Sequence, residues 1–168
     1  MEEILDIKPE RIERDFKTLE TFTDPTALWS RRAFSPEYKE ARAWLSEQFR
    51  LAGLEVFNDA ASNLIGRRGG DGNQVFMMGS HTDTVKSGGR FDGIVGVLGA
   101  LEIARCLQDS DINLSLPLEI VDFTCEEPTV NLSPLGSRIM AGDVAQNNLK
   151  GVVTPFGDTV FDAIDALG

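Results

Sequence analysis

Two apolar runs, each followed directly by a polar cluster, constrain the fold of this 168-residue chain more than any other feature. Residues 74–80 (QVFMMGS) end on His81, and residues 116–124 (LPLEIVDFT) end on the sequence Cys-Glu-Glu at 125–127. Short, continuous apolar runs of this kind predict buried strands, and we expect the first to be central in its sheet. Ligand crevices of α/β sheets lie outside the carboxyl ends of the strands, so we expect both clusters to line one crevice.

Helical patterns alternate with these strands. Residues 36–52 predict an amphipathic helix, because Ser35 suits the N-cap, Pro36 suits the first turn and Gly53 follows the last turn. Apolar spacing predicts further helices, and β-type patterns bounded by turn residues predict two shorter strands. The helices are expected at 9–22, 93–108, 135–140 and 159–167, the strands at 54–58 and 63–67, and a polar turn at 67–73. This alternation predicts an α/β layer fold.

Composition and charge restrict the class of partner. The net charge of −11 argues against nucleic acid and anionic membranes, because phosphate binding needs clustered Lys and Arg. No run approaches the roughly 18 apolar residues of a membrane span, and the N-terminus lacks a signal-peptide pattern, so we expect a cytoplasmic protein. Cys106 and Cys125 have no CxxC spacing, which favours free thiols over a disulfide.

His81 is the only histidine in the chain. Residues two apart in extended chain point the same way, so Asp83 can lie beside the imidazole and fix its tautomer for metal binding. A core histidine with Asp83 as a turn residue fits the same local pattern. Nucleophilic catalysis by Ser80, Ser137 or Cys125 would require His81 as the base, and no GxSxG motif is present.

Asp92 follows a glycine pair that lets the chain turn back toward the strand end. Its carboxylate suits a metal site near His81, and it equally suits the N-cap of the helix that begins near Gly93. The spacing of Gly93, Gly96 and Gly99 matches neither the dinucleotide fingerprint nor a P-loop. It favours a small-residue helix face that packs closely on the sheet.

Glu126 and Glu127 complete the candidate residues. Adjacent acids after a strand point in different directions, so one can hold a metal while the other moves a proton. A pair of solvated loop glutamates fits the same pattern. With His81 and Asp92, Glu127 supplies an N/O donor set that suits a hard or borderline divalent metal, zinc above all, and leaves Glu126 as a base.

These stretches together resemble the hydantoinase/carbamoylase family, within the aminoacylase and dipeptidase zinc metallopeptidase superfamily. The family includes N-carbamoyl-L-amino acid hydrolases, beta-ureidopropionases and allantoate amidohydrolases. The matching stretches, WSRRAFSPEYKEARAWL, LEVFNDAASNLIGRRGG, MGSHTDTVKSGGRFDGIVGVLGALE and IVDFTCEEPTVNLSPLGSRIMAG, run from about residue 28 to 142. The resemblance implies a zinc-exopeptidase-like catalytic domain, a three-layer α/β/α sandwich with a mixed, mostly parallel sheet, here truncated.

The resemblance also implies a role for each candidate residue. His81 and Glu127 would each bind one of two divalent metals, zinc or else Mn, Co or Ni, and Asp92 would bridge them. Glu126 would be the general base and acid, and Asp83 would orient His81. The peptide between Asp92 and the next residue would be cis. Such a site would hydrolyse a C–N bond of a small N-carbamoyl or ureido substrate through a metal-activated water.

The chain departs from this family in length. Family members are longer and carry further histidine ligands and a dimerising lid domain, which would lie beyond Gly168. We therefore expect residues 1–168 to be the N-terminal part of the catalytic domain of a homodimeric protein, with weak zinc occupancy and little turnover alone. Two other functions stay open: a dipeptidase or aminoacylase with the same metal chemistry, and a non-catalytic remnant that acts as a binding module.

Overall fold

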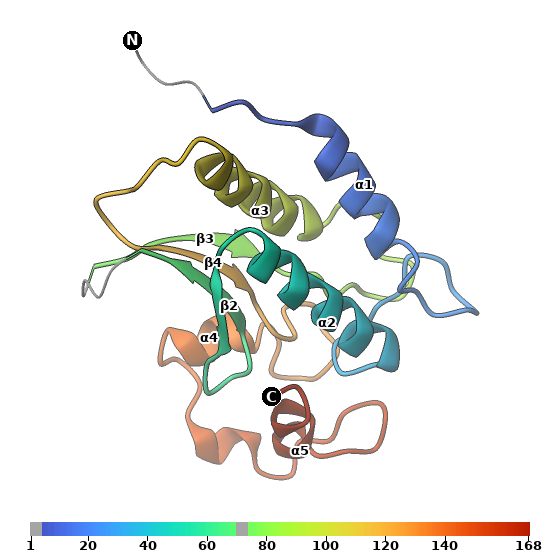
Figure 1. Cartoon of the computed structure of the whole chain (residues 1–168). Coiled ribbons are helices and arrows are strands. Elements are labelled where there is room, and N and C mark those ends of the chain that lie inside the picture. Colours follow the sequence, from blue (N-terminus) through green and yellow to red (C-terminus); the bar gives the residue numbers. More distant parts are fainter. Residues whose placement is uncertain (1–4, 70–73) are drawn as a thin grey trace.

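A four-stranded mixed sheet organises the chain in the computed structural model, which describes residues 5–69 and 74–168 (Figure 1). The strand order is β1-β2-β4-β3. The strands are β1 (Glu55–Asn58), β2 (Leu64–Arg68), β3 (Phe76–Ser80) and β4 (Leu118–Asp122). β1 pairs with β2 and β2 with β4 in antiparallel fashion, whereas β3 runs parallel to β4. The α/β fold and the mixed sheet are as predicted.

Two predictions about this sheet are wrong. The described strands are not mostly parallel, because two of their three pairings are antiparallel. β3 is not a buried central strand either: it lies at the edge of the sheet, and Phe76 and Met77 are 56% and 39% exposed. An apolar run indicates that a strand is hydrophobic and does not specify its neighbours, so an edge strand and a central strand look alike in sequence.

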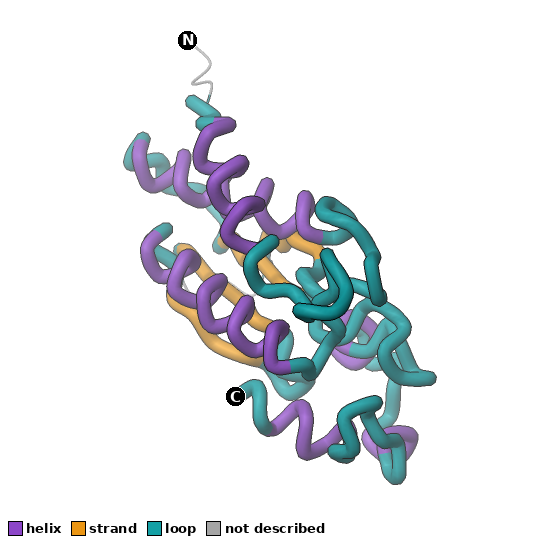
Figure 2. Tube along the Cα trace, turned by 90° about the vertical axis from the view of Figure 1, so that its right-hand side faces the viewer, coloured by secondary structure: helices purple, strands orange, loops and turns teal. Residues whose placement is uncertain are grey.

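Helices α2 (Pro36–Leu51) and α3 (Ile94–Asp109) share one apolar core with the sheet (Figure 2). Ser35 caps α2 as predicted, because its hydroxyl accepts the Tyr38 N–H at 3.2 Å. From α2, Leu45 and Phe49 are fully buried, and from α3, Val97 and Leu101. This core fixes the start of α3 above the carboxyl end of β3, where the candidate site lies.

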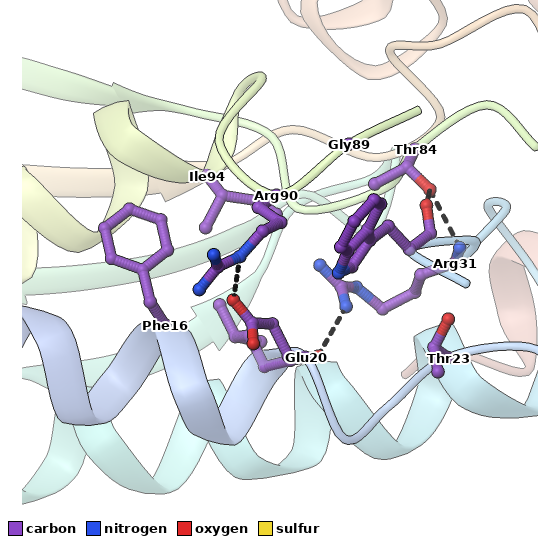
Figure 3. Close-up of a pocket in the computed structure, with 10 residues that line it drawn as sticks. Phe16, Glu20, Thr23, Arg31, Thr84, Gly89, Arg90 and Ile94 are labelled. Atoms are coloured by element: carbon purple, nitrogen blue, oxygen red, sulfur yellow. Dashed lines mark hydrogen bonds and ion pairs between the residues drawn. The ribbon is translucent and has the colours of Figure 1, made fainter. Parts of the chain in front are cut away.

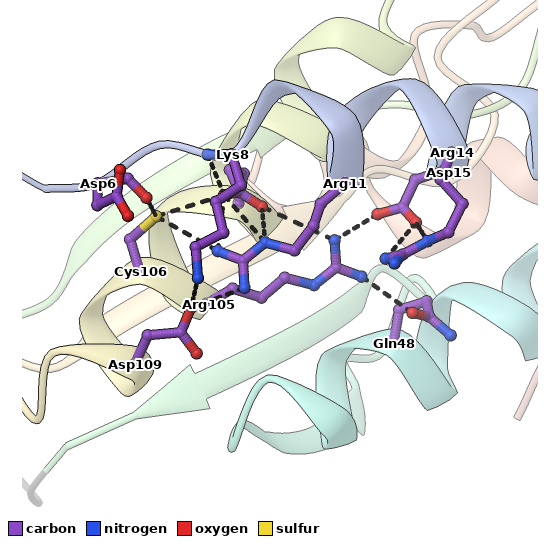
Figure 4. A network of polar contacts seen from close by, with 10 residues as sticks. Asp6, Lys8, Arg11, Arg14, Asp15, Gln48, Arg105, Cys106 and Asp109 are labelled. Atoms are coloured by element: carbon purple, nitrogen blue, oxygen red, sulfur yellow. Dashed lines mark hydrogen bonds and ion pairs between the residues drawn. The ribbon is translucent and has the colours of Figure 1, made fainter.

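Helix α1 (Pro9–Leu19) packs on α3 and is held there by ion pairs (Figure 4). The Arg11 guanidinium donates to both oxygens of the buried Glu102 carboxylate, at 2.9 and 2.7 Å. Farther along α1, the buried Asp15 pairs with Arg105, which also donates to Gln48 on α2 at 2.9 Å. These contacts connect α1, α2 and α3 through charged side chains as well as through apolar packing.

A second apolar cluster lies at the end of the molecule away from α1 and joins the C-terminal part of the chain to Ala33, Phe34 and Tyr38 (Figure 1). It contains α4 (Gly136–Met140), the 3-10 helix η1 (Gln146–Leu149) and α5 (Val160–Asp165).

Part of the predicted turn at 67–73 falls outside the described residues. No helix in the described ranges is long and apolar enough to cross a membrane. Both cysteines are free and buried, as predicted.

Candidate metal and hydrolytic site

The register of β3 and β4 brings the two polar clusters to one edge of the sheet. Ser80 lies opposite Asp122 at the end of the parallel pair, and the Phe123 N–H donates to the Ser80 carbonyl at 2.8 Å. The residues that follow each strand therefore leave the sheet at the same level. This register brings both clusters to one edge of the sheet, in line with the expectation that they line one crevice.

Three of the predicted residues can hold one metal ion. One ligand atom from each of His81, Asp92 and Glu127 lies within 4.8 Å of the others. They come from three segments: the residues after β3, the loop before α3 and the loop after β4. One imidazole and two carboxylates form a donor set that suits zinc or another divalent first-row metal.

The His81 ring has one nitrogen engaged and one available. Its Nδ1 lies 3.0 Å from the Asp83 backbone carbonyl and 3.5 Å from the Asp83 carboxylate. Burial alone would lower the pKa of His81, but the hydrogen bond and charge of Asp83, together with Glu127, raise it to about 9. Without a metal the imidazole is therefore protonated at neutral pH, and metal binding must displace that proton.

Gly93 lies directly against the His81 ring. A side-chain Cβ at this position would lie 2.4 Å from two atoms of the His81 ring, and φ at Gly93 is +68°. Only glycine combines this backbone with the space that the imidazole occupies. Gly96 allows a similar approach, since its Cβ would lie 2.7 Å from that of Ser80. A Cβ at Gly99 meets nothing within 4 Å, so the predicted close-packed glycine face is wrong at that position.

Asp83 is fully buried and connects the two clusters. Its carboxylate accepts the backbone N–H of Glu127 at 3.0 Å and that of Glu126 at 3.3 Å. Cys125 precedes these two residues with φ of +55°, an unusual value for a residue other than glycine, and turns the chain sharply there. The same carboxylate thus faces His81 and holds the backbone that carries both glutamates.

The structure excludes one of the two roles left open for Asp92 and one feature that the resemblance implied. Its side chain does not cap α3, because the N-cap residue is Gly93 and no side chain bonds there. The peptide after Asp92 is not cis, since Ser133–Pro134 is the cis peptide among the described residues. The positive φ of Gly93 turns the chain instead. Asp92 is exposed and uncommitted to the helix, so its carboxylate is available as a ligand.

Negative charge accumulates at this edge of the sheet. Burial raises the pKa of Glu127 above its ordinary value, and the carboxylates of Asp92, Asp83 and Glu126 add to the rise. The positive charge of His81 opposes it. Four carboxylates around one imidazole leave an excess of negative charge that a divalent cation would neutralise. The residues present therefore fit a metal ion.

The predicted base, Glu126, contacts a residue whose role the sequence does not reveal. The Ser137 hydroxyl, near the start of α4, lies 2.9 Å from each oxygen of the Glu126 carboxylate. Ser137 thus faces a carboxylate, and His81 Nδ1 faces Asp83. Burial raises the pKa of the Cys125 thiol to about 12, which makes it a poor nucleophile. Neither residue forms the pair with His81 that nucleophilic catalysis requires.

The sequence also did not predict the layer of buried polar side chains that lies beneath the site. The backbone N–H of Arg31, from the loop before α2, donates to the Thr84 hydroxyl at 2.8 Å (Figure 3). The Arg31 guanidinium donates to the Thr82 carbonyl at 2.9 Å. Arg42 of α2 lies 3.5 Å from Asp122 at the end of β4. The cavity beside Arg31 is about 10 Å³, no larger than one water molecule, so it has no room for a substrate.

The chain is similar to several known proteins. The model of Peptidase family M28 matches residues 63–156. The chain is 37% identical over 162 residues to a ureidoglycolate hydrolase of Oryza sativa subsp. japonica, covering 94% of this chain and 34% of that protein. It is 36% identical over 162 residues to an N-carbamoyl-L-amino-acid amidohydrolase of Paenarthrobacter aurescens, covering 95% and 39%.

The fold matches a solved structure of a hydantoinase/carbamoylase family amidase from Burkholderia ambifaria. The TM-score is 0.89 at 34% identity, and the match covers 99% of this chain and 42% of that one. The chain therefore spans about a third to two fifths of the length of the proteins it matches. From its sequence and its fold, it belongs to the amidohydrolases of the hydantoinase/carbamoylase type, within the group that the Peptidase family M28 model describes, and represents their N-terminal part.

Proposed function

We propose that this chain is the metal-binding part of an amidohydrolase that cleaves an amide or ureido C–N bond of N-carbamoyl amino acids, allantoate or similar small molecules. The observation that carries the proposal is the convergence of His81, Asp92 and Glu127, with donor atoms within 4.8 Å, beside the adjacent carboxylate of Glu126. The relatives named above are hydrolases of C–N bonds, which supports the reaction class.

In this proposal His81, Asp92 and Glu127 would hold the divalent metal or metals, zinc first. A metal bound there would lower the pKa of water toward neutrality and polarise the substrate carbonyl. Glu126 takes the proton from the attacking water and delivers it to the leaving nitrogen. Asp83 orients His81 and keeps both glutamates in place through their backbone N–H groups.

The remaining features of the whole protein are part of the same proposal. Residues 1–168 form the N-terminal part of a catalytic domain that becomes a three-layer sandwich in the complete protein. The lid domain, the other metal ligands and most of the substrate pocket lie in sequence outside this chain, and the complete protein is a cytoplasmic homodimer. The relatives' greater length supports this division.

A panel of substrates tests the reaction class. The full-length gene product, loaded with zinc, is assayed on an N-carbamoyl amino acid, the matching N-acetyl amino acid and a dipeptide. We expect the N-carbamoyl compound to be turned over fastest. The match to a peptidase family favours one alternative, a dipeptidase or aminoacylase, and faster cleavage of the dipeptide or the N-acetyl compound would replace our proposal with it. No turnover of any of the three would indicate a binding module.

A further inference from the structure

We propose that Ser137 is a positioning residue for Glu126, an assignment that rests on the proposed function. Its hydroxyl lies at equal distance, 2.9 Å, from both oxygens of the Glu126 carboxylate. A donor placed symmetrically between the two oxygens fixes the plane of the carboxylate and limits rotation about its last bond. Glu126 is half-buried, so free rotation would otherwise let the carboxylate point to solvent.

A hydroxyl suits this task better than a cation does. It donates its hydrogen bond while Glu126 is ionised, and it can accept one when Glu126 carries a proton. Ser137 keeps its own proton in both states. The contact therefore persists through the cycle in which Glu126 takes a proton from water and returns it to the leaving nitrogen. A lysine or arginine would stabilise only the ionised state.

The backbone around Ser137 is fixed independently of Glu126. The buried Asn63 side chain accepts the Thr124 N–H at 2.8 Å and donates to the Gly136 carbonyl at 3.1 Å. The Gly136 N–H in turn donates to the Thr124 carbonyl at 2.8 Å. Asn63 thus connects the loop after β4, which leads to Glu126, to the start of α4, which carries Ser137.

Space at Gly136 shows how close these two segments are. A Cβ there would lie 2.1 Å from the Asn63 side-chain oxygen and 2.7 Å from the Thr124 backbone nitrogen. The loop after β4 and the start of α4 are therefore in direct contact. This contact fixes the position of the Ser137 hydroxyl relative to the Glu126 carboxylate.

The test combines one kinetic and one thermal readout. In the full-length gene product, Ser137→Ala is expected to lower kcat on the N-carbamoyl substrate about tenfold or more, because a misplaced base slows the reaction while binding stays intact. KM and zinc affinity stay unchanged, and Ser137→Thr restores kcat. Ser133→Ala is the matched control, since its hydroxyl lies 3.4 Å from the Cys125 sulfur, and it leaves kcat unchanged.

The thermal readout needs no turnover. If the two side chains interact, the Tm loss of Ser137→Ala combined with Glu126→Ala is smaller than the sum of the two single losses. Additive losses, or equal kcat values for Ser137→Ala and Ser133→Ala, would overturn the assignment. If Glu126→Gln leaves turnover intact while the Tm losses are non-additive, the proposed function fails and the Ser137–Glu126 contact stands as structural only.

Discussion

At the scale of single residues, the site depends on glycine at a position where any side chain would collide with the His81 ring. Gly93 lies against the His81 ring, and Asp83 faces Nδ1 of the same ring. The available ring nitrogen is thereby aimed away from Asp83. These two contacts decide whether the single imidazole of the chain can serve as a ligand.

Gly93→Ala is expected to weaken zinc binding about tenfold or more. The new Cβ would lie 2.4 Å from the His81 ring, so the ring must move from its position beside Asp92 and Glu127. Gly142→Ala is the matched control, because Gly142 has a similar φ of +75° and a Cβ there meets nothing within 4 Å. Zinc calorimetry on both variants measures the effect, and equal affinities would contradict it.

The stability of the metal-free protein is expected to fall between about pH 6.5 and 9. The pKa of His81 is raised from 6.5 to about 9 in the folded state. The folded chain therefore holds this proton more tightly than the unfolded chain, so the stabilisation is complete below pH 6.5 and is lost as pH rises through 9. Urea unfolding with a chelator present measures the slope. His81→Gln should flatten it, and an unchanged slope would show that another group is responsible.

At the scale of elements, capping and periodicity predict the helices well. They do not predict contacts between residues that are distant in sequence. Ser35, Pro36 and Gly53 mark both ends of α2 correctly because caps are local chemistry. The edge position of β3 depends on which strand lies beside it, which no local pattern carries.

The candidate site divides in the same way. His81, Asp92 and Glu127 could be predicted because metal ligands belong to a few residue types. The parts played by Asn63 and Ser137 could not, because amides and hydroxyls serve many structural purposes. Asn63 acts through partners 61 and 73 residues away in sequence, and such contacts exist only once the sheet has formed.

The contact of α1 with α3 allows a stability prediction. Asp15→Ala is expected to destabilise the protein by about 3 kcal/mol, because the buried Arg105 loses the carboxylate that lies nearest to it and keeps only Gln48 and the more distant Glu102. Glu13→Ala, which breaks the exposed pair with Lys17, should cause no measurable change. Urea unfolding compares the two variants. Equal effects would show that the Asp15–Arg105 pair contributes no more than a surface pair.

At the scale of the whole molecule, the chain is short relative to the proteins that it matches, and β3 lies at an edge of the described sheet. The chain spans 42% of the amidase structure that it matches over 99% of its own length. It also holds a single histidine. We therefore expect the 168-residue chain alone to bind zinc weakly and to turn over N-carbamoyl amino acids poorly, and tight binding of two zinc ions with rapid turnover would contradict this.

The same edge should drive self-association of the 168-residue chain. Among the described residues β3 is an edge strand, and its exposed Phe76 and Met77 place apolar side chains where another strand could pair. Met77→Lys is expected to reduce concentration-dependent association, because a charge on an edge strand opposes strand pairing. Leu51→Lys, at an exposed site at the end of α2, is the matched control. Sedimentation velocity measures both, and equal association would rule out the β3 edge as its cause.

In the proposed function, Glu126 moves the proton at a metal site that His81, Asp92 and Glu127 would hold. The most direct test of this proposal is the turnover of an N-carbamoyl amino acid by the zinc-loaded full-length gene product and its Glu126→Gln variant, with zinc content measured in both. We expect the variant to retain its zinc and to lose about 10²- to 10⁴-fold in kcat, the usual contribution of a general base. A variant that keeps both its zinc and its kcat would contradict the claim.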